Sequence, residues 1–171
     1  MILLLNGTSS SGKTTIATQF RDTSEDQWVL MSLDDFYEKL PSTKTDNWAP
    51  MAQFSSCFYQ TAALWEKEGY RVILDTVLDD PIYVEHLKEF FREMQVLLVA
   101  VHCPLEELKR RERARGDRTI GLAEKQFDKV HVHFPYDLEL NSAEMTIGHC
   151  VDKLRELHAS PPDPGAFAHV K

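Results

Sequence analysis

The sequence predicts an α/β fold in which a five-stranded parallel sheet carries helices on both faces. Apolar runs of strand length alternate with stretches of helical periodicity along most of the chain. A glycine-rich loop joins the first expected strand to the first expected helix. The length of 171 residues suits one domain with a substantial core. Strands and helices in this alternation build a parallel sheet that is covered on both sides.

The expected elements follow in order along the chain. Five apolar runs are short enough for strands and are separated by helical patterns. The expected strands cover residues 2–5, 28–32, 71–74, 96–101 and 138–140. The expected helices cover residues 13–21, 54–68, 81–93, 104–114, 122–130 and 146–159. Residues 1–159 therefore form one domain, and the proline-rich residues 160–171 form an irregular tail, for which fraying is the simpler interpretation than a functional cover.

The segment 7–14, GTSSSGKT, has the pattern of a phosphate-binding loop and stands between a strand and a helix, the context that this pattern needs. Gly7 and Gly12 let the backbone curl so that its N–H groups point at an anion, and the helix that begins near Lys13 adds its dipole. Lys13 would reach the β- and γ-phosphates, and the Thr14 hydroxyl would bind Mg²⁺. The chain is thus expected to bind a nucleoside triphosphate in a P-loop NTPase or kinase fold. The expected nucleotide-binding residues are Gly7, Thr8, Ser9, Ser10, Ser11, Gly12, Lys13, Thr14 and Thr15.

Composition excludes several other classes of protein. The formal net charge of −8 argues against general nucleic-acid binding. The apolar start of the chain is too short for a signal peptide, and no segment approaches the roughly 20 apolar residues of a membrane span. Three scattered cysteines (Cys57, Cys103 and Cys150) form neither a CxxC pair nor an even disulfide set. A cytoplasmic protein without a membrane partner is expected.

Carboxylates follow the second and third expected strands, where ligands gather in parallel sheets. Asp34 and Asp35 come directly after the second strand, and one of them could accept the proton of an acceptor hydroxyl. Capping of a helix is the structural alternative for either aspartate, and it is the task expected of the one that is not catalytic. Asp75 closes the apolar run 72–74, the form of a Walker B strand whose acid acts on Mg²⁺, although apolar strands ending in aspartate are common. Asp79 and Asp80 are interpreted as the start of the next helix.

Residues 109–118 carry six basic and two acidic side chains, a local reversal of the overall charge. The segment begins on a helix and breaks at Gly116, so Arg115 and Arg118 are expected on a lid, around residues 111–121, that closes over the transferring phosphoryl group. The alternative is a solvated helix face with Glu106–Arg110 and Glu107–Arg111 pairs. That alternative is adopted for Lys109, Arg110 and Arg113.

Two further groups of residues are weaker signals. Phe54, Phe58 and Trp65 share a helical stripe and are expected in the core, whereas Tyr37 and Trp48 lie outside the stripe and could line an acceptor pocket. His131 and His133 form an HxH pair, but no third ligand stands at a recognisable spacing, so a metal site is not expected there.

Several segments together resemble the chloramphenicol phosphotransferase-like family of P-loop small-molecule kinases. They are residues 4–14 (LLNGTSSSGKT), 33–36 (LDDF), 72–77 (VILDTV), 101–103 (VHC), 112–118 (ERARGDR), 121–126 (GLAEKQ), 130–131 (VH) and 136–140 (YDLEL). The resemblance implies ATP with Mg²⁺ as the phosphoryl donor, and it places the base on Asp34 rather than Asp35. Asn141-Ser142 stands where an Asp-Thr pair is expected after the fifth strand, so the family's contacts to the nucleotide there do not transfer to this chain. Residues 37–68 match poorly, so the acceptor does not transfer with the fold.

These observations favour an ATP-dependent kinase of a small hydroxylated molecule. Its catalytic residues would be Lys13, Asp34, Arg115 and Arg118, and Thr14 with Asp75 would hold the metal. A kinase of a nucleoside or sugar nucleotide, including a zeta-toxin-like enzyme, is the nearest alternative. A GTPase-type switch is more distant, because neither an NKxD box nor a DxxG motif occurs. The sequence indicates neither the acceptor nor an oligomeric state.

Overall fold

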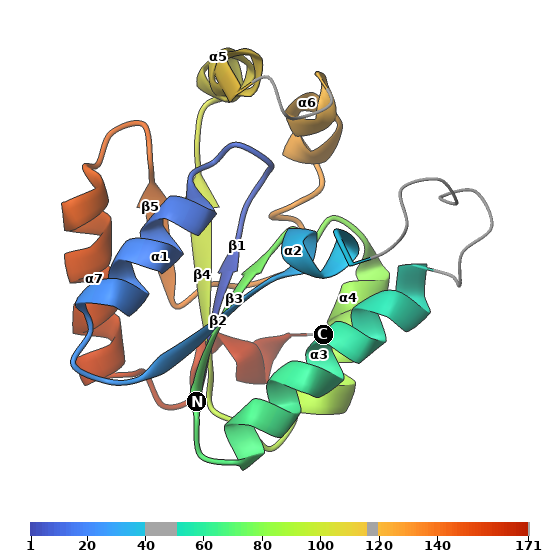
Figure 1. Cartoon of the computed structure of the whole chain (residues 1–171), viewed down its shortest axis with the longest axis vertical. Coiled ribbons are helices and arrows are strands. Elements are labelled where there is room, and N and C mark those ends of the chain that lie inside the picture. Colours follow the sequence, from blue (N-terminus) through green and yellow to red (C-terminus); the bar gives the residue numbers. More distant parts are fainter. Residues whose placement is uncertain (40–50, 116–119, 171) are drawn as a thin grey trace.

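The five strands form one parallel sheet in the order β2-β3-β1-β4-β5 (Figure 1). This computed structural model describes residues 1–39, 51–115 and 120–170. The strands are β1 (Ile2–Asn6), β2 (Trp28–Ser32), β3 (Arg71–Thr76), β4 (Val96–His102) and β5 (Leu138–Asn141). The sequence prediction of a five-stranded parallel sheet is confirmed, and each predicted strand lies within its observed bounds.

The two faces of the sheet carry separate hydrophobic cores, because alternate side chains of a strand point to opposite sides. Leu3 and Leu5 of β1 pack toward helices α1 (Lys13–Thr23) and α7 (Ile147–Ala159). Ile2 and Leu4 pack toward α3 (Met51–Lys67) and α4 (Pro81–Phe91). Figure 1 shows these two helix pairs on opposite sides of the sheet. The predicted arrangement with helices on both faces is therefore confirmed.

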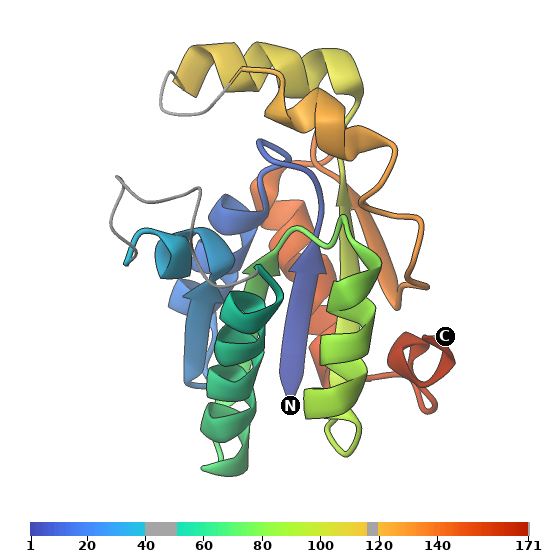
Figure 2. The ribbon, with the colours of Figure 1, turned by 90° about the vertical axis from the view of Figure 1, so that its right-hand side faces the viewer.

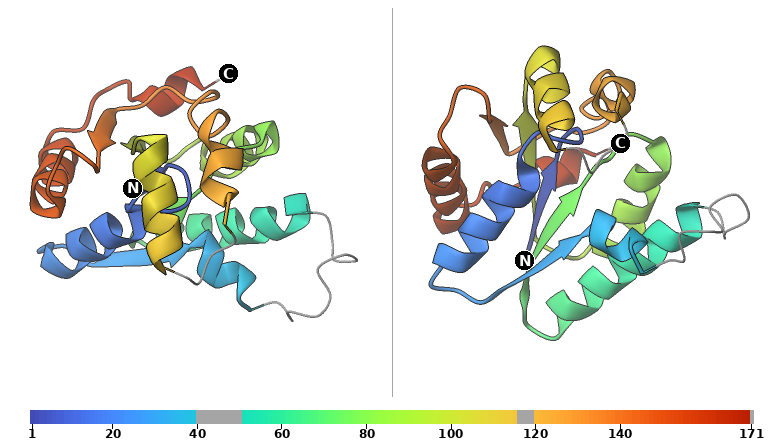
Figure 3. Two further views of the ribbon diagram at one scale, coloured as in Figure 1. Left: turned by 90° about the horizontal axis from the view of Figure 1, so that it is seen from above. Right: turned by 45° about the horizontal axis from the view of Figure 1, so that its top comes forward.

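Three short segments lie at the carboxyl end of the sheet. Helix α2 (Leu33–Tyr37) follows β2 directly and was not predicted as a helix. Helices α5 (Leu105–Arg115) and α6 (Leu122–Phe127) lie over this end of the sheet (Figure 2), and Figure 3 shows them from above. This end of the sheet is where the phosphate loop also lies, so α2, α5 and α6 surround it.

The C-terminal segment packs against the domain instead of fraying. A 3₁₀ helix, η2 (Ala166–His169), contacts β4, and the Ala166 N–H donates to Asp137 Oδ1 at 2.6 Å. Val170 is 9% exposed and belongs to the core on the α3–α4 side. The segment is held against the domain because its apolar side chains pack on that core.

Other expectations about packing have mixed outcomes. Phe58 is fully buried, but Trp65 is 38% exposed, so its expected place in the core is wrong. Trp48 lies outside the described residues. Among the helices that the structure describes, none is long and apolar enough to span a bilayer.

Candidate active site at the phosphate loop

The loop between β1 and α1 has a backbone that only glycine tolerates at two positions. Gly12 has φ 95°, in the left-handed region, and immediately precedes α1. A Cβ atom on Gly7 would lie 2.5 Å from the Val101 carbonyl oxygen. Both glycines of the predicted motif are therefore required by the geometry, one for conformation and the other for close approach to β4.

Lys13 and Asp75 are buried beside the loop, and the exposed Thr14 contacts Asp75. Because β3 pairs with β1 so that Asp75 faces Leu5, the carboxylate lies next to the start of α1. Lys13 Nζ donates to the Thr8 carbonyl at 3.0 Å and lies 3.9 Å from Asp75 Oδ1. Thr14 Oγ1 donates to Asp75 Oδ2 at 2.5 Å. The structure thus brings together the two residues that the sequence assigns to the metal.

The Asp75 carboxyl is subject to opposing influences. Burial raises its pKa, whereas the Lys13 ammonium and the Thr14 hydroxyl act to lower it. The residue is only 6% exposed, as is Lys13. Lys13 and Asp75 therefore lie together, buried beside the phosphate loop.

A cavity of about 220 Å³ opens between the phosphate loop, α2 and the segment after β3. Its lining includes residues of the loop and of β3 (Lys13, Thr14 and Asp75), residues that follow β2 and β3 (Asp34, Tyr37, Asp79 and Tyr83), and Arg115 and Gln126 from α5 and α6. Asp34 is exposed on the first turn of α2 and faces this cavity, whereas Asp35 does not line it. The N-cap of α2 is Ser32, so the expectation that one of the two aspartates caps the helix is wrong.

The segment after β3 divides its two carboxylates between different tasks. Asp80 is the N-cap of α4 and accepts from the Ile82 N–H at 2.9 Å, which confirms the predicted helix start. Asp79 lines the cavity instead. Burial raises the pKa of the Asp79 carboxyl, and Lys129 and Gln126 act to lower it.

Arg115 lies at the last residue of α5 and lines the cavity, which places it beside the phosphate loop. The companion arginine, Arg118, lies outside the described residues, as do residues 116–119 of the expected lid. Glu112 of α5 joins the described residues on the two sides of this segment. This residue is 1% exposed and accepts from the Gly121 N–H at 2.7 Å and the Ala123 N–H at 3.0 Å.

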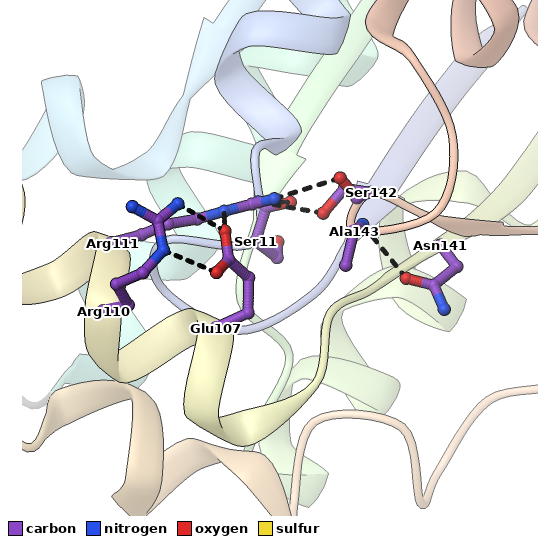
Figure 4. A network of polar contacts seen from close by, with 7 residues as sticks. All are labelled: Ser11, Glu107, Arg110, Arg111, Asn141, Ser142 and Ala143. Carbon is purple, nitrogen blue, oxygen red and sulfur yellow. Dashed lines mark hydrogen bonds and ion pairs between the residues drawn. The ribbon is translucent and has the colours of Figure 1, made fainter.

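Arg111 is a residue of this region that the sequence reasoning missed. Its Nη1 donates to Ser142 Oγ at 3.0 Å and to the Ser11 carbonyl at 3.4 Å, and its Nη2 donates to the Ser142 carbonyl at 3.0 Å (Figure 4). Its Nε donates to Glu107 at 2.8 Å, which is the pair that sequence spacing predicts. Arg111 therefore ties the phosphate loop to the segment after β5. In the sequence, the signal for Arg111 is its i,i+4 spacing from Glu107, and that spacing favours a solvent-exposed ion pair on a helix surface.

Ser142 contributes to a second cavity behind the phosphate loop. The Ser142 N–H donates to the His102 carbonyl at 3.0 Å. Asn141 Oδ1 accepts from the Ala143 N–H at 3.1 Å (Figure 4). The second cavity is lined by residues of the loop, of α5 and of the start of α7, among them Gly12, Thr15, Arg111, Arg115, Ser142 and Ile147. Thr15, predicted to bind nucleotide, thus lines both cavities.

A polar cluster supports the start of the phosphate loop from behind. Asn6 Nδ2 donates to the Val130 carbonyl and to the Tyr136 hydroxyl, each at 2.7 Å. The Tyr136 hydroxyl lies 3.0 Å from His131 Nδ1, and the His131 ring packs on His102 with ring centroids 4.2 Å apart. No metal-binding group of three or more His, Cys, Asp or Glu side chains occurs within the described ranges. His131 is thus a structural neighbour of the loop.

The chain belongs to a family of phosphotransferases. It matches the family described as Chloramphenicol phosphotransferase-like protein over residues 1–159, so the predicted resemblance is confirmed. A curated relative in Mycobacterium tuberculosis, named as a candidate O-phosphotransferase, is 28% identical and aligns over 99% of this chain and 87% of its own length. Membership in this family makes the chain a phosphotransferase of the kinase type.

Solved structures confirm the P-loop kinase fold. The Mycobacterium tuberculosis APS kinase in complex with AMPPNP and APS superposes with a TM-score of 0.70 at 16% identity, over 93% of this chain and 97% of its own. The Deinococcus radiodurans tunicamycin resistance protein gives 0.69 at 15% identity, over 94% and 98%. The Acinetobacter baumannii shikimate kinase in complex with shikimate gives 0.65 at 14% identity, over 93% of each chain. At these identities the likeness concerns the fold alone.

Proposed function

We propose that the protein transfers the γ-phosphoryl group of ATP to a hydroxyl group of a small molecule. One observation carries the proposal: a single cavity joins the phosphate loop, Lys13 and Asp75 to the Asp34 carboxylate on a separate helix. Phosphoryl transfer needs little more than a positioned donor, a positioned hydroxyl and charge stabilisation between them. We call one side of the cavity the acceptor half (Leu33, Asp34, Tyr37, Asp79 and Tyr83). The donor half consists of the phosphate loop with Lys13, Thr14 and Asp75, together with Arg111, which contacts the loop from the second cavity.

The donor half would hold the triphosphate through loop N–H groups, the Lys13 ammonium and the N-terminus of α1. The second cavity, between Arg111 and the start of α7, offers space for the nucleoside beyond the loop. Arg115 lines both cavities, a position from which its guanidinium could stabilise charge on the transferring group. Arg118 is proposed for the same role from the sequence alone.

Mg²⁺ fits the chemistry of the donor half. The Thr14 hydroxyl and the Asp75 carboxylate already touch and are oxygen donors, which this cation prefers. Bound there, Mg²⁺ would neutralise part of the phosphate charge. Thr14 and Asp75 are accordingly the residues proposed to hold it, directly or through water.

In the acceptor half, Asp34 would orient the acceptor hydroxyl and take its proton as the new O–P bond forms. The bond between the γ-phosphorus and the bridging oxygen breaks, and ADP leaves with the electron pair. The products are the phosphate monoester, ADP and one proton. The acid–base help that such a carboxylate supplies is typically worth about 10²–10⁴ in rate.

The test compares two adjacent aspartates. Acceptor-dependent ADP release is measured for the wild type, Asp34→Asn and Asp35→Asn across a panel of alcohols that includes sugars, nucleosides and chloramphenicol. The proposal expects Asp34→Asn to lose about 10²–10⁴ in kcat while still binding nucleotide. Asp35→Asn, which alters an exposed carboxylate that does not line the cavity, should retain activity. Equal losses in the two variants, or no acceptor dependence in the wild type, would contradict it.

The setting proposed for this activity is the cytoplasm, where ATP is abundant. Free Cys57, Cys103 and Cys150 are compatible with a reducing compartment. The acceptor is proposed to be a small molecule, and modification of an antibiotic is one form that this activity could take.

A further inference from the structure

Glu112 is a buried carboxylate that the proposed phosphoryl transfer leaves unused. It belongs to α5 and is 1% exposed. Its Oε2 accepts from the Gly121 N–H at 2.7 Å, and its Oε1 accepts from the Ala123 N–H at 3.0 Å. Hydrogen bonds from backbone N–H groups, that of Ala123 above all, lower the pKa of this carboxyl, although burial opposes them. Glu112 is therefore held as an anion by the backbone at the start of a different helix.

These bonds supply the N-terminal cap that α6 does not have in its own sequence. The N-cap residue of α6 is Gly121, with φ 90°, and glycine has no side chain that could accept from the first N–H groups of the helix. A helix of six residues is too short to be stable alone. A carboxylate at its N-terminus satisfies these N–H groups and interacts favourably with the helix dipole. Glu112 thus attaches this end of α6 to α5, which lies beside it (Figure 2).

The other contacts between α5 and α6 are small or exposed. The buried apolar residues there form a cluster apart from the two cores of the sheet: Cys103, Leu108 and Ala123. Lys109 and Glu124 link the two helices at 2.8 Å, but the Glu124 side chain is 59% exposed. Solvent screens such an ion pair, which contributes little to stability. The buried bonds of Glu112 therefore matter most for how α6 is oriented.

Gln126 lies near the other end of α6 and contacts the phosphate loop. Its Oε1 accepts from the Ser9 N–H at 2.9 Å, and its side chain also bonds to Asp79. Val130, which follows α6, accepts through its carbonyl from Asn6 Nδ2 at 2.7 Å. Gln126 thus lies between two attachments of this segment, one at Glu112 and the other at Asn6. Without the first attachment, α6 would be free to tilt and to withdraw Gln126 from the loop.

The loop needs this support because its backbone is strained beside Ser9. The next residue, Ser10, has φ 67°, in the left-handed region that is unfavourable for residues with a side chain. A conformation of this kind persists only where surrounding contacts hold it. The bond from the Ser9 N–H to Gln126 is one such contact. A loop that is already held in one shape loses less conformational freedom when a triphosphate binds.

We propose that Glu112 is a positioning residue of the nucleotide site, which caps α6 and so holds Gln126 on the Ser9 N–H of the phosphate loop. This role rests on the proposed phosphotransferase function and adds to it a residue that acts through Gln126. Glu112 itself does not touch the nucleotide. Its contribution reaches the phosphate loop through one helix and one side chain.

The test is a double-mutant cycle on nucleotide binding. Binding of Mg-AMPPNP, without any acceptor, is measured by calorimetry for the wild type, Glu112→Gln, Gln126→Ala and the variant with both substitutions. Glu112→Gln keeps the size of the side chain but loses its charge and one of its two acceptor oxygens, so one N–H of α6 loses its partner. Glu124→Gln is the matched control, because it makes the same substitution on an exposed side chain that links the same two helices.

Glu112→Gln should weaken nucleotide binding by about 2–10-fold, the cost of losing the neutral hydrogen bond at Ser9. In the Gln126→Ala background the same substitution should change binding by less than about 2-fold, since residues that act through one contact are not additive. Glu124→Gln should bind like the wild type. Unchanged binding in Glu112→Gln, or losses that add fully in the double variant, would overturn the inference.

Failure of the proposed function has a different signature, because this binding is measured without an acceptor. A wild type that binds Mg-AMPPNP but releases no ADP with any acceptor contradicts the transfer alone, and the cycle still decides the role of Glu112. A wild type that does not bind Mg-AMPPNP overturns both. If Glu112→Gln does not fold, Glu112→Asp, which is one methylene shorter and cannot keep both bonds, replaces it in the cycle. If neither variant folds, Glu112 serves the stability of the whole domain, and the positioning role is overturned.

Discussion

The donor and acceptor halves of the cavity differ in how their polar groups are matched. In the donor half, Asp75 lies 2.5 Å from the Thr14 hydroxyl and 3.9 Å from the Lys13 ammonium, because β3 pairs with β1, the strand that leads through the loop into α1. In the acceptor half, Asp79 forms no ion pair with a described residue, and hydrogen bonds to its own backbone and to Gln126 oppose the rise in its pKa that burial causes. A site organised before binding suits a ligand that is common to a whole family, whereas the side of the cavity that receives the acceptor is where selectivity would be set.

The largest effect is expected from Lys13, because it lies closest to the developing phosphate charge. Lys13→Ala should lower kcat by about 10²–10³-fold, the usual cost of removing one charge-stabilising donor, and should do so for every acceptor. Steady-state ADP release with several acceptors measures it. Lys125→Ala, an exposed lysine of α6, is the control and should leave kcat unchanged. A loss that depends on the acceptor would mean that Lys13 does not belong to the donor half alone.

Arg111 should have a smaller effect that is confined to the nucleotide. Arg111→Lys keeps the charge but loses the planar fork that joins Ser11 to Ser142. We expect the KM for ATP to rise by about 10–100-fold, with the KM for the acceptor unchanged. Arg110→Lys is the matched control, since Arg110 is 68% exposed and pairs with Glu107 on the helix surface. Similar changes in the two variants would contradict a clamp on the phosphate loop.

These two residues also show what sequence can and cannot predict. Lys13 belongs to a motif of eight consecutive residues in a strand–loop–helix context, so its position follows from local sequence. Asp75 was found because it closes an apolar strand. Arg111 reaches Ser11 across 100 positions, and Asn6 reaches Tyr136 across 130, and periodicity contains no signal for such pairs. The local interpretations of Arg111 as a surface pair and of Asp79 as a helix start were each incomplete for that reason.

A residue at the border of the two halves gives a finer test. Gln126 lines the cavity, and its Oε1 accepts from the Ser9 N–H at 2.9 Å. Gln126→Ala removes this neutral hydrogen bond as well as the one between Gln126 and Asp79, and because of the first we expect the KM for ATP to rise by about 2–10-fold. Gln19→Ala, on the exposed side of α1, should have no effect. If only the KM for the acceptor changed, Gln126 would have to be assigned to the acceptor half of the cavity.

The smallest expected effect concerns stability and not rate. Burial lowers the pKa of His131 from its ordinary value of 6.5 to about 4, and His102 and Lys13 act in the same direction, whereas Glu139 opposes them. The unfolded chain therefore binds a proton at His131 more readily than the folded protein does. This contribution to the free energy of unfolding is complete above pH 6.5 and falls as the pH is lowered toward about 4.

His131→Gln tests this expectation, because glutamine can still bond to the Tyr136 hydroxyl but does not titrate in this range. Urea unfolding at pH 7 and at a pH near 4.5 should show a smaller loss of stability in His131→Gln than in the wild type. The exposed His149→Gln should behave like the wild type. Because His131 reaches the phosphate loop through Tyr136 and Asn6, acidification should also weaken nucleotide binding more in the wild type than in His131→Gln. Equal acid sensitivity in all three proteins would show that the cluster of Asn6, Tyr136 and His131 does not stabilise the phosphate loop.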